Sequence, residues 1–152
     1  MRHRHVLVSV TVLGIACAHA VTVPETPMPV VPADGPPTLA RLAGARHFEL
    51  GAAVQGEPLL ADSAYANAVV RDFTMVSTEN ALKFGPLRPS PEQYDFSEAD
   101  AIVRFAETHA LRVRGHTLVW KRQLPAWLTG GTFMRNELIT ILREHIDRKS
   151  VV

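Results

Sequence analysis

Apolar residues recur along the chain in two alternating periods, one typical of strands and one typical of helices. Short apolar runs at Phe48–Val54, Thr74–Thr78 and Val113–Trp120 predict three buried strands, since they are rich in alanine, β-branched or aromatic residues. Apolar positions spaced three or four apart predict helices between and after these strands. Strands that alternate with helices indicate α/β class, with a parallel sheet and right-handed crossovers. The pattern alone fits a doubly wound sheet as well as a barrel.

Capping residues and prolines set the expected limits of the helices. Asp62 or Ser63 can cap one helix, and Ser97 opens a second with a capping-box-like sequence. Prolines at 86, 89 and 91 predict an irregular loop after the second strand, because each removes a backbone donor and disfavours helix just before it. The expected helices span about 38–45, 62–72, 97–109 and 134–145.

The first 37 residues predict export rather than a folded core. A basic start, an apolar run and Ala18-His19-Ala20 are typical of a signal peptide over 1–20 that is cleaved after Ala20. A lipoprotein signal ending at Cys17, the sole cysteine, is the alternative. Residues 21–37 are rich in proline without apolar periodicity, which predicts an extended linker.

Charge and glycine positions exclude two classes of partner. The formal net charge is +1 and the basic residues are scattered, so nucleic acid is not an expected partner. No glycine-rich phosphate loop follows the first strand, which argues against a dinucleotide-binding fold.

Two polar stretches at strand ends carry the candidate chemistry. Strand period places His116 and Trp120 on one face, where an indole can stack on a sugar ring and an imidazole can bond its hydroxyls. A core strand with a satisfied histidine fits the same pattern. Glu79 and Asn80 follow the second strand and fit either a sugar site or a helix cap, while Lys83 taken alone fits a solvated charge.

Both stretches resemble known motifs. Arg114-Gly-His-Thr-Leu-Val-Trp followed by Gln123-Leu-Pro-Ala-Trp closely resembles the third-strand signature of glycoside hydrolase family 10, the retaining endo-β-1,4-xylanases. Thr78-Glu-Asn-Ala-Leu-Lys-Phe84 resembles that family's second-strand signature. The resemblance implies the first three βα units of a TIM (β/α)8 barrel, truncated, with 38–146 as the N-terminal part of the catalytic domain.

The resemblance also implies the roles of individual residues. Trp127 is expected to pack at the base of the loop, and Lys121 departs from the histidine usual in the family, so it receives no role. The implied ligand is xylan or a xylo-oligosaccharide, without cofactor or metal. Six positions would line the xylan cleft on the non-reducing side of the scissile bond: Glu79, Asn80, Lys83, His116, Trp120 and Gln123.

The two carboxyl groups that a retaining glycosidase needs are not expected within these 152 residues. The family's acid/base follows a Trp-Asp-x-x-Asn-Glu motif on strand four, and its nucleophile lies on strand seven; neither motif occurs here. The chain as given is therefore expected to be inactive. Residues 147–152 match the translation of a common sequencing adapter and are interpreted as a non-native tail, with a genuine helix end as the alternative.

Three hypotheses for function follow. The first is the N-terminal fragment of a secreted endo-1,4-β-xylanase. The second is a non-catalytic secreted carbohydrate-binding module, and the third is a small exported domain in which the histidine and tryptophans are only core residues. A Trp-Asp-x-x-Asn-Glu stretch in the continuation of the gene would support the first alone.

Overall fold

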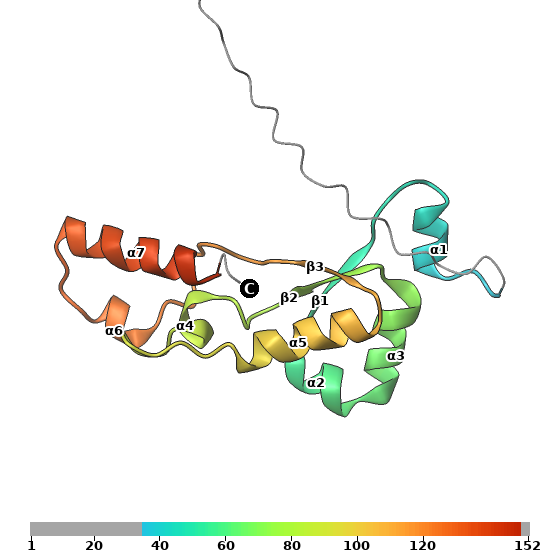
Figure 1. Ribbon diagram of the computed structural model, residues 1–152, viewed down its shortest axis with the longest axis horizontal. Coiled ribbons are helices and arrows are strands. Elements are labelled where there is room, and N and C mark those ends of the chain that lie inside the picture. The colour runs from blue at the N-terminus through green and yellow to red at the C-terminus, as the bar shows by residue number, and fades with distance from the viewer. Residues whose placement is uncertain (1–34, 150–152) are drawn as a thin grey trace, which may run out of the picture.

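The computed structural model describes residues 35–149, so the predicted signal peptide and most of the predicted linker lie outside the described residues. Three parallel strands form one sheet in the order β1-β2-β3 (Figure 1). The strands are β1 (Gly51–Val54), β2 (Met75–Thr78) and β3 (Arg112–Arg114). Parallel neighbours linked through helices confirm the α/β prediction, because each crossover returns the chain to the same edge of the sheet.

Four of the helices lie where the apolar pattern predicts them, and three short ones were not predicted. The predicted set is α1 (Leu39–Gly44), α3 (Ser63–Asp72), α5 (Ser97–Thr108) and α7 (Arg135–Lys149). The additional set is α2 (Gly56–Ala61), α4 (Phe84–Leu87) and α6 (Ala126–Thr129). The additional helices are four to six residues long, which is fewer than two turns.

Capping follows one prediction and contradicts another. Asp62 Oδ1 accepts hydrogen bonds from the backbone N–H groups of Ala64 and Tyr65, as expected for the cap of α3. The capping box predicted at Ser97 is wrong. Asp95 Oδ1 accepts both the N–H and the hydroxyl of Ser97, so the serine side chain is already engaged and Ser97 is the first residue of α5.

The hydrophobic core lies between the sheet and the helices that cross over it. Its buried residues come from β1, β2, the helices α2, α3 and α5 and the turn after β2, and include Val54, Leu59, Val69, Val76, Ala81, Ile102 and Ala106. Figure 1 shows α6 and α7 at the other end of the molecule from α1 and α3. No helix among residues 35–149 is both long enough and apolar enough to cross a bilayer.

The third strand is much shorter than predicted. Pairing with β2 ends at Ser77–Arg114, and the chain from Gly115 to Arg122 is irregular. The prediction of a buried strand over Val113–Trp120 is therefore wrong, and Leu118 is 54% exposed. A strand persists only while a neighbour offers backbone partners, and β2 itself ends at Thr78.

Candidate functional site

Asn80 joins the segments that follow the second and third strands. Its Oδ1 accepts a hydrogen bond of 3.0 Å from Lys83 Nζ and one of 3.2 Å from Gln123 Nε2. Gln123 lies 43 positions further along the chain, so the fold brings the two predicted motifs together. Asn80, Lys83 and Gln123 are called the Asn80 corner below.

The backbone places Gln123 in this corner. Gly85 N donates to Gln123 O at 2.8 Å, and Gln123 has a φ of 56°, in the left-handed region. A Cβ atom added at Gly85 would lie 2.7 Å from the same carbonyl oxygen, so a residue without a side chain is required for this close approach. Sequence reasoning missed Gly85; its position directly after Phe84, the last residue of the second-strand motif, was the available signal.

Glu79 lies beside the corner and has a different partner. Its backbone N–H donates to Val54 O at 2.9 Å, which continues the contact between the first two strands. Its exposed side chain accepts a hydrogen bond of 2.8 Å, to Oε2, from Gln55 Nε2. Gln55 was not predicted as a site residue, although it is the first polar residue after the first strand. The polar edge therefore extends over the ends of all three strands.

His116 and Trp120 lie in the irregular segment that follows β3. Thr78 Oγ1 donates to His116 O at 3.0 Å, and this single bond continues the contact between the second and third strands. The Trp120 side chain is 40% exposed. Within residues 35–149, no hydrogen bond or ring contact joins the imidazole or the indole to the Asn80 corner. The predicted shared strand face is wrong for this pair, because the strand ends before them.

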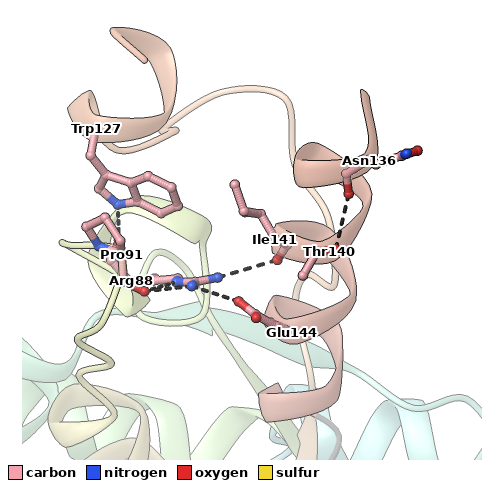
Figure 2. A network of polar contacts seen from close by, with 7 residues as sticks. All are labelled: Arg88, Pro91, Trp127, Asn136, Thr140, Ile141 and Glu144. Carbon is pink, nitrogen blue, oxygen red and sulfur yellow. Dashed lines mark hydrogen bonds and ion pairs between the residues drawn. The ribbon is translucent and has the colours of Figure 1, made fainter. Parts of the chain in front are cut away.

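A second network ties α6 to the end of α4 and to α7 (Figure 2). Arg88 is 5% exposed, and its guanidinium donates to Pro91 O, to Ile141 O and to the Glu144 carboxylate, the last at 2.9 Å. Trp127 Nε1 donates to Arg88 O at 3.0 Å, and the guanidinium lies 5.3 Å from the indole centroid. Trp127 thus packs at the base of the loop, as predicted, and holds the segment that carries Gln123.

A buried histidine supports the same region from behind. His145 is fully buried and stacks on Phe84 with ring centroids 3.7 Å apart. Neither of its ring nitrogens has a hydrogen-bond partner in the described part of the chain. Burial, followed by the positive charges of Lys149 and Arg88, lowers the pKa of His145 to about 4. The ring is therefore neutral at neutral pH and packs as an aromatic residue.

The donor and acceptor types at this edge suit a polyhydroxylated ligand. The Glu79 carboxylate accepts, the Lys83 ammonium donates, and the Asn80 and Gln123 amides do both, which matches the vicinal hydroxyls of a sugar. Among residues 35–149, no three histidine, cysteine, aspartate or glutamate side chains gather as metal ligands. The arrangement can bind and orient a sugar by hydrogen bonds.

Comparison with known proteins identifies the family. The profile described as "Glycosyl hydrolase family 10" matches residues 38–151. Endo-1,4-beta-xylanase B of Paenibacillus barcinonensis is 38% identical over 107 residues, which cover 68% of this chain and 31% of that protein. A beta-1,4-xylanase of Dictyoglomus thermophilum is 41% identical over 100 residues, or 66% of this chain and 27% of that protein.

A solved structure agrees with the sequence comparisons. Xylanase 10B of Thermotoga petrophila RKU-1, solved in complex with xylobiose, has a TM-score of 0.68 and 34% identity; the match covers 74% of this chain and 35% of that one. The chain thus spans about a third of the length of the proteins it matches. These matches confirm the prediction that the sheet and its helices are the first three βα units of a TIM barrel. The chain belongs to glycosyl hydrolase family 10.

Proposed function

We propose that this chain is the N-terminal part of a secreted endo-1,4-β-xylanase that hydrolyses xylan with retention, and that it supplies the sugar-binding edge of that enzyme. The observation that carries the proposal is the Asn80 corner, in which Lys83 from the same motif and Gln123, 43 residues from Asn80, both donate to Asn80 Oδ1. Family membership and the xylobiose complex of a related xylanase support a xylo-oligosaccharide as the ligand.

The proposed contacts follow from the chemistry of each side chain. Glu79, Asn80, Lys83 and Gln123 hydrogen-bond the hydroxyls of sugars on the non-reducing side of the scissile bond. His116 and Trp120 shape the pocket of the sugar being cleaved, where the exposed part of the indole covers an apolar ring face. Xylan or a β-1,4-linked xylo-oligosaccharide is the partner, and nucleic acid is not.

The same proposal assigns binding, and not hydrolysis, to these 152 residues. Retention requires two carboxyl groups about 5–5.5 Å apart, one as acid/base and one as nucleophile. Glu79 is assigned to sugar binding, and the sequence contains no Trp-Asp-x-x-Asn-Glu motif for an acid/base. One carboxylate cannot perform a two-step displacement, so the chain as given is inactive while the enzyme it belongs to is a glycosidase.

Export is part of the proposal and rests on the sequence of residues 1–20. The basic start, apolar run and Ala-x-Ala site direct the protein to the periplasm or the medium, where its polymeric substrate is accessible. Cleavage after Ala20 leaves a mature chain without cysteine. Mass spectrometry of the exported product tests this directly, because processing at Cys17 would leave a lipid-modified N-terminus instead.

The decisive experiment combines sequence and binding. The gene is read beyond codon 152, where a Trp-Asp-x-x-Asn-Glu stretch is expected; a stop codon or unrelated sequence would favour a non-catalytic carbohydrate-binding module. The chain itself is titrated with xylobiose by NMR and assayed for reducing sugar released from xylan. Binding that is weakened by Asn80→Ala, with no sugar released, is the expected result. Release of sugar that is abolished by Glu79→Gln would contradict the assignment of Glu79 to binding.

A further inference from the structure

Gln55 occupies the same place after β1 that Glu79 occupies after β2. The two strands are in register through Val54 and Thr78, so the next residue of each strand stands at the same level of the sheet. The bond from Glu79 N to Val54 O extends this alignment by one step. Gln55 and Glu79 are therefore neighbours along the polar edge because of the strand register.

The backbone of Gln55 is fixed from its other side. Gly56 N donates to Glu98 Oε1 of α5 at 2.9 Å, and a Cβ atom added at Gly56 would lie 2.6 Å from Glu98 Cγ. Gln55 is the N-cap residue of α2, yet its side chain makes no capping hydrogen bond. Its amide instead donates to Glu79 Oε2 at 2.8 Å. An exposed glutamine that bonds across strands in preference to its own helix has a defined orientation.

Glutamine is well suited to orient this carboxylate. Lys83, the cation of the second-strand motif, donates to Asn80. Among residues 35–149, the side chain that hydrogen-bonds the Glu79 carboxylate is that of Gln55. A neutral amide holds one oxygen of the carboxylate without neutralising its charge, which leaves the other oxygen as a strong acceptor for sugar hydroxyls. A side chain ordered before binding also loses less entropy when the ligand arrives.

We propose that Gln55 is a positioning residue for sugar binding, which orients the Glu79 carboxylate toward the hydroxyls of the bound xylose. This inference rests on the proposed function and adds the first strand to its binding edge. Gln55 acts through Glu79, so its removal weakens binding through the geometry of that carboxylate.

The test is titration of the full chain with xylobiose for four variants. Gln55→Ala is expected to weaken binding about five-fold, as for loss of one exposed hydrogen bond. Gln55→Glu is expected to weaken it roughly tenfold or more near pH 7, because two carboxylates repel and Glu79 turns away. Lowering the pH to about 5 should restore much of this loss in Gln55→Glu alone, since the carboxyl pair then shares a proton. Gln93→Ala, an exposed glutamine of the loop before α5, is the matched control and should leave the affinity unchanged.

Asn80→Ala, the fourth variant, separates the two levels of the proposal. Weak binding by Asn80→Ala together with unchanged binding by both Gln55 variants would overturn the role of Gln55 and leave the proposed function intact. Binding unaffected by Asn80→Ala would overturn the proposed site and the role of Gln55 with it. A pH-independent loss in Gln55→Glu, equal to the loss in Gln55→Ala, would also contradict the inference, because a merely structural residue has that signature.

Discussion

The end of the second strand and the segment after the third strand carry the two motifs of this chain. They differ in how their side chains are held. After β2, Glu79, Asn80 and Lys83 each make a hydrogen bond to another residue of the polar edge. After β3, backbone carbonyls accept hydrogen bonds from Thr78 and Lys149, but within residues 35–149 the side chains of His116 and Trp120 make none to this edge, and Trp120 is 40% exposed. In both segments the residue types alone left a structural role open, and the family resemblance favoured a sugar site.

The difference lies in what surrounds each strand. β2 is the central strand and pairs with a neighbour on both sides, whereas β3 pairs with β2 over three residues. Backbone groups without a strand partner hydrogen-bond to water or to side chains, and the extended conformation is then no longer stabilised by strand pairing. A residue type suited to a strand is thus insufficient when the tertiary partner is missing along that stretch.

Amide hydrogen exchange should separate the two regions by the largest margin. The amides of β2, such as those of Val76 and Thr78, are expected to be protected by at least about 3 kcal/mol more than those of residues 115–120. The reason is that β2 pairs with a strand on both sides, while residues 115–120 pair with no strand among the described residues. Equal protection in the two regions, measured by mass spectrometry or NMR, would break the comparison.

Acid should loosen the ordered region through His145. Its pKa is about 4 in the fold and about 6.5 when exposed, so the unfolded chain takes up the proton first as the pH falls. The contribution of His145 to the free energy of unfolding is fully present above about pH 6.5. It falls as the pH drops toward 4, by about 1.4 kcal/mol per pH unit at most. Urea unfolding at about pH 7 and pH 5 should therefore show a loss of about 2 kcal/mol.

Replacement of His145 tests the source of this pH dependence. His145→Leu should reduce the loss between the two pH values, because it removes the group that titrates and the two ring nitrogens left without a partner. His109→Gln is the control, since His109 is exposed on the surface after α5. An unchanged pH slope in His145→Leu would show that other groups control the acid response.

Gly85→Ala should damage the Asn80 corner by overpacking. The new methyl group would meet Gln123 O at 2.7 Å, so the loop must move and Gln123 leaves Asn80. A loss of about 2 kcal/mol in the free energy of unfolding is expected, together with weaker xylobiose binding. Gly44→Ala at the end of α1 meets nothing within 4 Å and serves as the matched control. If the two variants behave alike, the close contact of Gly85 is unimportant.

The smallest effect is expected in the segment after β3. Trp120→Ala should weaken xylobiose binding by about 1 kcal/mol, because the indole offers an apolar face to the sugar ring. Lys121→Ala should have almost no effect, since Lys121 is exposed and has no assigned contact. Calorimetric or NMR titration compares the two neighbours directly. A greater loss for Lys121→Ala would contradict the assignment of the sugar contact to Trp120 in the third-strand motif.

Local signals in the sequence determined the α/β class, the longer helices and the polar stretch that follows the second strand. Asp62 caps α3 where its residue type predicts, because an N-cap depends on contacts within one turn. The family motifs also predicted Asn80, Lys83 and Gln123 as site residues, and the fold brings these three side chains together. Such a motif depends on residue type and order along the chain, and both are present in the sequence.

Only the tertiary structure decided how far β3 extends and which residues complete the edge. Gln55 reaches Glu79 through strand register and Gly85 reaches Gln123 through the close approach of a distant carbonyl, and neither contact leaves a local pattern. Ser97 does not take its predicted capping role, because its N–H and hydroxyl both donate to Asp95 and it is the first residue of α5. Contacts between residues far apart in sequence, or in competition for one partner, depend on geometry that residue type alone does not specify.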